Sequence, residues 1–141
     1  MSEQQTLARL NSHLPKFIHM LGGEIVAVDS QARSCTFSFN IGRDFCHSVD
    51  VVQGGFVTAM LDAAMSHAVF AMQDDDSLVN LSSLEIKTSY LETTRAGSLR
   101  AEGTIIKAGY KLAFLEGRLF DAQGVLTATC SSVAKLIRAK P

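Results

Sequence analysis

Residues 54–72 read GGFVTAMLDAAMSHAVFAM, and this stretch decides the fold. In a helix of this composition the apolar side chains point in almost every direction and leave only a narrow polar strip. A helix that is apolar nearly all round is buried inside a protein. The Gly54-Gly55 pair at its start is tolerated at the beginning of a helix. We therefore expect a long buried helix over about residues 54–72, at the centre of the molecule.

The segments around this helix have the patterns of a surface helix and of antiparallel strands. Apolar residues at helical spacing predict an amphipathic helix over about residues 3–21, which Pro15 should break or kink. Residues 41–52 and the acidic run at residues 74–76 are expected to be loops. Alternating polar and apolar residues between turn signals predict strands over residues 24–29, 33–40, 84–90, 98–107, 110–120 and 125–137.

The order of these elements indicates the fold class. It runs from a helix through two strands to the buried helix, and then through about four more strands. A small helical partner alone cannot cover a helix that is apolar all round, so the sheet must curl around it. No repeat, low-complexity segment or second domain interrupts the pattern. The sequence therefore predicts a single α+β domain over residues 1–141, with an antiparallel sheet wrapped around one long buried helix.

The composition argues against several kinds of partner. Of the 141 residues 47% are apolar and 19% are charged, which is enough for a core and too apolar for disorder. The net charge is -1 and no basic cluster occurs, so a nucleic acid or an anionic membrane has no electrostatic basis. The N-terminus lacks the apolar region of a signal peptide, and no apolar run approaches the roughly 20 residues of a membrane span. We expect a soluble, cytoplasmic protein.

The cysteines do not indicate a disulfide or a metal site. Cys35, Cys46 and Cys130 are an odd number at unrelated spacings, and none belongs to a CxxC pair. In a cytoplasmic protein this is typical of small buried hydrophobes. No glycine-rich phosphate loop or GxSxG elbow is present, so nucleotide hydrolysis and serine hydrolase chemistry lack their usual markers. We expect neither a metal nor a cofactor.

Asp62 is the most informative polar residue. It lies more than two turns inside the buried helix, where aspartate is unfavourable, and it cannot cap the helix start. No cationic residue stands three or four positions away, and Thr58, Asp62 and Ser66 form a narrow polar strip. A carboxylate on such a surface is costly unless it is paired or used. The pattern leaves two interpretations open: a structural salt bridge to a distant Lys or Arg, and a catalytic carboxylate.

The segment in front of the helix holds the other candidates. The Gln53-Gly54-Gly55 run is either a plain helix start or a place where backbone N–H groups polarise a carbonyl oxygen. His47 precedes it by a few residues. A single loop histidine is typical of a surface residue, and a metal site would need more ligands nearby.

Residues 47–62, HSVDVVQGGFVTAMLD, resemble a motif of the hotdog thioesterases related to the phenylacetate-pathway enzyme, the PaaI-like family. The family's pattern is Asn, a few residues, His or Gln, Gly-Gly, and then an acidic residue on the helix. Residues 83–91 and 107–135 also resemble that family's strands, so the resemblance covers nearly the whole chain. It implies the hotdog fold and hydrolysis of acyl-CoA thioesters to free acid and CoA.

The resemblance also implies roles for five residues. Asp62 matches the catalytic carboxylate, as nucleophile or as general base for water. Gly54 matches the glycine whose N–H polarises the thioester carbonyl, and Gln53 matches the His/Gln position beside it. Ser83 matches a strand hydroxyl that in some members helps to position the attacking water. His47 stands where the family usually has Asn or Gln, and its imidazole either donates a hydrogen bond or titrates.

Two rival functions stay open. A hotdog enoyl-CoA hydratase or dehydratase pairs a catalytic histidine with a carboxylate, and His47 is compatible with that reading. A non-catalytic acyl-CoA-binding protein is the other. Sensors of that kind carry a DNA-binding domain, for which the first 22 residues are too short.

Helix geometry predicts that each active site is shared between two chains. Gly54 and Asp62 are eight residues apart, which is about 12 Å along a helix axis. A polarising N–H and a carboxylate acting on one carbonyl group should stand only roughly 6 Å apart. Two such helices, antiparallel across a two-fold axis, bring Gly54 of one chain to Asp62 of the other. We expect a homodimer, and the resemblance implies that two dimers often form a homotetramer.

Overall fold

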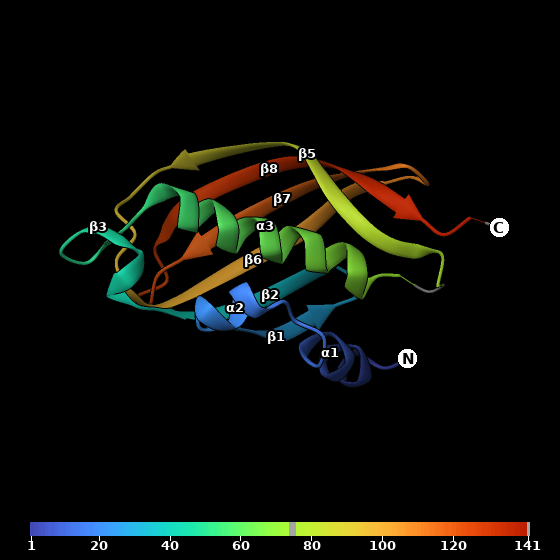
Figure 1. The fold of residues 1–141 in the computed structure, drawn as a ribbon, viewed down its shortest axis with the longest axis horizontal. Helices are drawn as coiled ribbons and strands as arrows, with labels where there is room; N and C mark the ends of the chain where they lie inside the picture. The colour runs from blue at the N-terminus through green and yellow to red at the C-terminus, as the bar shows by residue number, and fades with distance from the viewer. Residues whose placement is uncertain (74–75, 141) are drawn as a thin grey trace.

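A computed structural model describes residues 1–73 and 76–140, and in it a six-stranded antiparallel sheet carries a long helix across one face (Figure 1). The elements in chain order are α1 (Glu3–Asn11), α2 (Lys16–Met20), β1 (Gly23–Asp29), β2 (Ser34–Ile41), a 3-10 turn (Arg43–Phe45), β3 (Cys46–Ser48), β4 (Val51–Val52), α3 (Gly54–Ala71), β5 (Leu78–Tyr90), β6 (Gly97–Ala108), β7 (Leu112–Phe120) and β8 (Leu126–Arg138). The predicted fold class is confirmed: an antiparallel sheet packs around one central helix.

The sheet order is β1-β2-β6-β7-β8-β5, with every neighbouring pair antiparallel. The strand that follows α3 therefore does not pair with β6, the next strand in the chain. It crosses to the far edge of the sheet and pairs with β8, as the upper strand in Figure 1 shows. This crossover places β5 alongside α3 at a free edge of the sheet, which is the setting of the candidate site.

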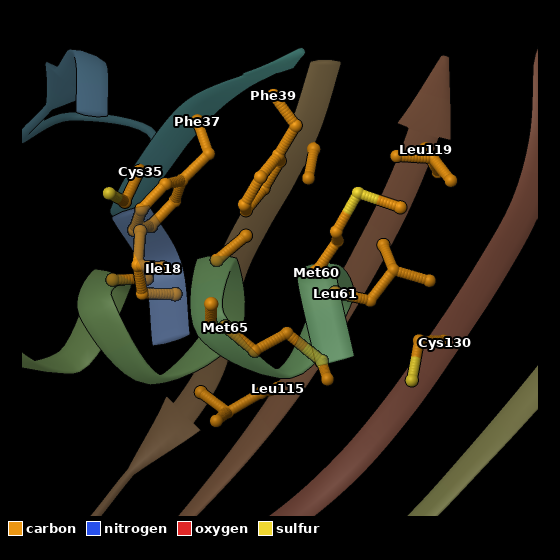
Figure 2. Close-up of a cluster of buried hydrophobic side chains, with 14 of the residues drawn as sticks. Ile18, Cys35, Phe37, Phe39, Met60, Leu61, Met65, Leu115, Leu119 and Cys130 are labelled. Atoms are coloured by element: carbon orange, nitrogen blue, oxygen red, sulfur yellow. The ribbon is translucent and has the colours of Figure 1, made fainter. Parts of the chain in front are cut away.

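The core lies between α3 and the concave face of the sheet (Figure 2). Met60, Leu61 and Met65 of α3 are fully buried and meet large side chains such as Phe37 and Phe39 of β2, whose rings stack at 5.3 Å. The helix α3 is long and apolar enough to span a membrane, but the core helices of soluble proteins have the same length and composition. In this fold most of its apolar side chains are covered by the sheet and the N-terminal segment.

Two glycines on the sheet let the helix approach closely. A Cβ atom on Gly103 of β6 would collide with the backbone of Ala64 and Met65. A Cβ atom on Gly117 of β7 would stand 3.2 Å from the Leu61 side chain. The first of these contacts is with helix backbone, so no side-chain rearrangement relieves it. The distance between α3 and the sheet is therefore fixed at Gly103.

Two segments differ from the sequence expectation. Strand β5 begins at Leu78, whereas the sequence predicted a strand from residue 84. The break expected at Pro15 is found, and the helix predicted over residues 3–21 is two helices, with Pro15 in extended conformation as the N-cap of α2. Residues 41–52, expected to be loop, contain the 3-10 turn and the hairpin of β3 and β4. Strands of three and two residues are too short to show an alternating pattern. Of the predicted acidic loop, residues 74–75 lie outside the described residues, and Asp76 is exposed in a turn.

Candidate active site

The polar strip of α3 faces β5. Thr58 Oγ1 lies 2.8 Å from Thr88 Oγ1, and four residues further along the helix Asp62 accepts a hydrogen bond of 2.9 Å from Ser83 Oγ. Both pairs are partly buried between the helix and the edge strand. The spacing of four residues that marked these positions in the sequence therefore puts them on one face of α3, opposite polar partners on β5.

Asp62 has no cationic partner in the described part of the chain. The ion pairs there are Arg95 with Asp50 and Arg100 with Glu102, and neither involves this carboxylate. Within residues 1–73 and 76–140 its one hydrogen-bond partner is the Ser83 hydroxyl. The described residues thus hold no salt bridge to Asp62, and the catalytic role that the sequence left open stays a prediction.

The start of α3 presents one free backbone donor. The Gly55 N–H donates to Gln53 Oε1 at 2.7 Å, and the N–H groups of Phe56 and Val57 donate to the Gln53 carbonyl oxygen at 3.0 and 3.3 Å. The Gly54 N–H has no acceptor among residues 1–73 and 76–140. It stands at the positive end of an 18-residue helix, which favours a developing negative charge.

Gln53 thus has a clear local function in this structure. Its side chain folds back onto the helix start and caps the neighbouring glycine, Gly55. The cap occupies the Gly55 donor and leaves the Gly54 donor uncovered. The role that the resemblance implies for Gln53, beside the reacting carbonyl, stays a prediction.

The Gly54 end is also held from β5, by a residue that the sequence analysis did not identify. The Tyr90 hydroxyl donates to the Gly54 carbonyl oxygen at 2.7 Å and lies 3.2 Å from Thr58 Oγ1. The alternation of β5 showed that Tyr90 and Thr88 share a face. It carried no signal that this face meets the helix start, because that contact joins residues 36 positions apart.

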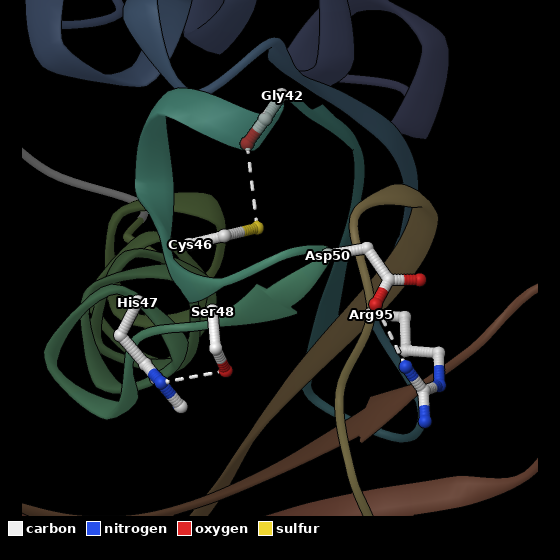
Figure 3. A network of polar contacts seen from close by, with 6 residues as sticks. All are labelled: Gly42, Cys46, His47, Ser48, Asp50 and Arg95. Carbon is white, nitrogen blue, oxygen red and sulfur yellow. Dashed lines mark hydrogen bonds and ion pairs between the residues drawn. The ribbon is translucent and has the colours of Figure 1, made fainter.

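His47 lies on the β3–β4 hairpin in front of α3 (Figure 3). Its Nδ1 atom is 3.0 Å from Ser48 Oγ, and the side chain is exposed. The hairpin is fastened to the segment before β6 by a 2.7 Å ion pair between Asp50 and Arg95. At its tip Val49 has φ +38°, which is strained for a β-branched residue and persists only where the surroundings impose it.

A cleft of about 490 Å³ brings several of these groups together. Its lining includes His47, Gly54, Val57, Tyr90 and Glu92. A larger hollow of about 630 Å³ lies at the opposite end of α3, between α1 and the β1–β2 turn, and contains none of the predicted site residues. The smaller cleft, at the free N–H, is therefore the better candidate for binding a reacting group. Of the five predicted residues only His47 and Gly54 line it, and Gln53, Asp62 and Ser83 do not, so one chain does not bring all five together.

The cysteines and His67 belong to the packing. Cys35 and Cys130 are buried, Cys46 is partly buried, and all three are free thiols in the described chain. Burial raises the pKa of Cys35 to about 12 and also raises the pKa of Cys130, so both stay protonated at neutral pH. Burial lowers the pKa of His67, whose ring meets Phe37 edge-on at 5.2 Å. In the described residues no three His, Cys, Asp or Glu side chains gather as metal ligands.

Comparison with known proteins places this chain in a family. A family model of the thioesterase superfamily matches residues 50–128, which include β4, α3 and strands β5 to β7. The chain therefore belongs to the thioesterase superfamily, and its activity is that of a thioester hydrolase. No curated protein matches the chain in sequence.

Solved structures agree on the fold over nearly the full length. A phenylacetic acid degradation-related protein from Ralstonia eutropha JMP134 is 29% identical, with a TM-score of 0.83 over 96% of this chain and 100% of that chain. A thioesterase from Haemophilus influenzae is 19% identical, with a TM-score of 0.83 over 94% and 90% of the two chains. The PaaI protein of the E. coli phenylacetic acid degradation operon is 16% identical, with a TM-score of 0.81 over 96% of each chain. The resemblance to PaaI-like hotdog thioesterases is confirmed.

Proposed function

We propose that the protein hydrolyses acyl-CoA thioesters to the free acid and CoA. The observation that carries the proposal is the polar strip of α3. Within the part of the chain that the structure describes, this strip starts at a backbone N–H without an acceptor and leads, two turns later, to a carboxylate without a cation. Every helix begins with N–H groups that lack an intrahelical acceptor, but a partly buried carboxylate inside an otherwise apolar helix has no such structural reason.

The chemistry follows from these two groups. The Gly54 N–H donates a hydrogen bond to the thioester carbonyl oxygen and stabilises the oxyanion that forms there. Asp62 acts on the carbonyl carbon from the other side, either by direct attack or by taking a proton from an attacking water. In the water route the hydroxide adds to the carbonyl carbon, the C–S bond breaks, and the CoA thiolate takes up the proton that Asp62 removed from the water. In the direct route the carboxylate displaces the CoA thiolate and forms a mixed anhydride. Water then hydrolyses this anhydride, which releases the free acid, restores the carboxylate and supplies the proton for the thiolate. Ser83 holds the carboxylate, and His47 stands at the cleft beside the substrate.

Each site is proposed to combine two chains. Within one rigid helix Gly54 and Asp62 are about 12 Å apart, which is too far for one carbonyl group. Two features of β5 support a two-fold partner. In the described residues it pairs along one side only, with β8, and the 13-residue strand exposes the large side chains of Val79, Leu84 and Tyr90. A second copy at this edge would cover an unpaired ladder and bring the two α3 helices together.

This arrangement makes the protein a homodimer, or a homotetramer built from two such dimers. We propose that it acts in the cytoplasm, with an acyl-CoA as its partner and with no nucleic acid and no membrane. The even mixture of charges, 13 basic and 14 acidic residues, supports the absence of a polyanionic partner.

The test is a panel of short-chain, medium-chain and aryl acyl-CoA thioesters, read by a thiol reagent that detects free CoA. We expect thiol release from at least one of them, and its loss in Asp62→Asn. A parallel assay with enoyl-CoA follows the loss of the conjugated double bond. Hydration without thiol release would assign the lyase chemistry instead. Binding with neither reaction would assign a non-catalytic acyl-CoA-binding protein.

A further inference from the structure

The hydrogen bonds between α3 and β5 form a chain with a single direction. Tyr90 has one hydroxyl proton, which goes to the Gly54 carbonyl oxygen at 2.7 Å. Its oxygen must then accept the proton of Thr58 at 3.2 Å, and Thr58 in turn accepts from Thr88 at 2.8 Å. The directed chain therefore begins at the Thr88 hydroxyl. The Cys130 sulfur lies 3.5 Å from Thr88 Oγ1, and its S–H is directed to the Ser131 carbonyl oxygen at 4.0 Å.

This chain ends on the peptide group next to the free donor. Hydrogen bonds arranged head to tail polarise and stiffen one another. The Tyr90 hydroxyl lies so close to the helix start that a Cβ atom on Gly54 would meet it at 3.0 Å and the ring carbon behind it at 3.1 Å. On the other side the Gln53 side chain holds the Gly55 N–H at 2.7 Å. The peptide group between Gly54 and Gly55 is therefore held at both its carbonyl oxygen and its N–H. The Gly54 N–H has no acceptor in the described residues.

We propose that Tyr90 is the positioning residue for the Gly54 oxyanion donor. The hydrogen-bond chain from Thr88 through Thr58 to Tyr90 fixes the orientation of that N–H. This inference rests on the proposed thioester hydrolysis. The orientation of this N–H matters because a donor displaced from the oxyanion no longer stabilises the transition state, while substrate binding changes little. The Tyr90 ring also forms part of the wall of the 490 Å³ cleft, so hydroxyl and ring are separable contributions.

The experiment uses Tyr90→Phe, which keeps the ring and removes only the hydroxyl. We expect kcat to fall about 3- to 10-fold, the effect of one lost hydrogen bond, with KM changed by less than about 2-fold. Tyr110→Phe is the matched control. Tyr110 is an exposed tyrosine on the β6–β7 turn, beneath the Arg138 guanidinium and away from the cleft, and its variant should behave like the wild type.

A double-mutant cycle with Gly54→Ala separates positioning from general support of the fold. The added methyl group would stand 3.0 Å from the Tyr90 hydroxyl and 3.1 Å from the ring carbon, so Gly54→Ala itself displaces the donor. Because both variants then act on the same N–H, Tyr90→Phe should lower kcat less in the Gly54→Ala background than in the wild type. Thr58→Val, which removes the donor to Tyr90, should lower kcat about 2- to 3-fold, and its effect should shrink when the tyrosine hydroxyl is already absent.

The outcomes distinguish this inference from the proposed function. A wild-type protein that releases no thiol from any thioester would overturn both. With an active wild type and an inactive Asp62→Asn, a Tyr90→Phe enzyme with unchanged kcat would overturn the positioning role alone. So would a raised KM at unchanged kcat, or effects of Gly54→Ala and Tyr90→Phe that simply multiply. If Tyr90→Phe fails to fold, Thr58→Val decides the question by the same split between kcat and KM.

Discussion

The two faces of α3 are built on opposite principles. On the face toward the sheet, Met60, Met65 and Ala64 are fully buried, and the backbone itself rests on Gly103. On the face toward β5 the side chains are short, polar and partly buried, and they meet hydroxyl groups at hydrogen-bond distance. The first face holds the helix through volume and close contact. The second face holds paired polar groups that contribute little volume to the core, and it is the face to which the proposed function assigns the chemistry.

This comparison predicts that variants on the two faces separate stability from turnover. Changes on the sheet face should lower the free energy of unfolding and reduce activity only through the amount of folded protein. Changes on the β5 face should lower kcat in a protein that is as stable as the wild type. A variant that moves both quantities together on both faces would show that the separation does not exist.

The largest effect on turnover is expected for Asp62→Asn. The amide has the same shape but cannot act as a base or nucleophile, so kcat should fall about 10²- to 10⁴-fold, the range for a positioned acid–base group. The free energy of unfolding should hold or rise, because the change removes a partly buried charge. Glu116→Gln, on the exposed outer face of β7, is the charge-matched control. Near-normal turnover on the best acyl-CoA would remove Asp62 from the mechanism.

The largest effect on stability is expected for Gly103→Ala. The new methyl group collides with the backbone of Ala64 and Met65, so α3 must shift away from the sheet. Overpacking against backbone should cost about 3 kcal/mol in the free energy of unfolding, measured by urea titration. Gly42→Ala is the control, since nothing lies within 4 Å of a Cβ atom there. Equal stability of the two variants would mean that the helix does not sit as closely as described.

Ser83→Ala should have an intermediate effect on kcat. It removes the 2.9 Å hydrogen bond to the Asp62 carboxylate and nothing from the sheet face. A hydrogen bond to a charged group contributes about 1.5 kcal/mol, so turnover should fall about 10-fold. Ser82→Ala, on the exposed side of the same strand, should leave turnover unchanged. If the two serine variants are equally active, the serine has no part in holding the carboxylate.

The smallest effect is a pH dependence of stability from the sheet face. Burial lowers the pKa of His67 from its usual 6.5, although its hydrogen bond to the Ala63 carbonyl and the nearby Asp62 act in the opposite direction. The unfolded chain therefore takes up a proton before the folded protein does. The contribution of His67 is present above pH 6.5 and is lost as the pH falls through the lower pKa of the folded state.

The measurement compares the free energy of unfolding of wild type and His67→Gln across this range. The difference between them should narrow as the pH falls from 7.5 to 5.5. His13→Gln, which changes an exposed histidine, should track the wild type at every pH. A constant difference between wild type and His67→Gln would mean that His67 does not titrate differently in the folded and unfolded states.

The sequence predicted the parts of this molecule that depend on periodicity. Asp62 was identifiable because a charged residue interrupts an apolar helix, and the buried helix and most of the long strands followed from spacing alone. The first six residues of β5 did not. Tyr90 was not identifiable, because its contact with Gly54 exists only once β5 has crossed to the edge beside α3. The β3–β4 hairpin was missed because its strands are too short for a pattern. The sequence could not show that the Gly54 N–H lacks an acceptor in the described residues. That observation needs the positions of the Gln53 oxygens, which accept from the neighbouring N–H groups.

The central claim is that the β5 faces of two α3 helices together form each active site. The most direct test co-expresses Asp62→Ala chains with Gly54→Pro chains and isolates the mixed dimer. Proline deletes the polarising N–H and is well tolerated at the first position of a helix, so the fold should persist. Each homodimer should be inactive. The mixed dimer should regain one intact site and about half of the wild-type turnover per dimer. Folded mixed dimers without thioesterase activity, or a fully active monomer in sedimentation at assay concentration, would contradict the shared site.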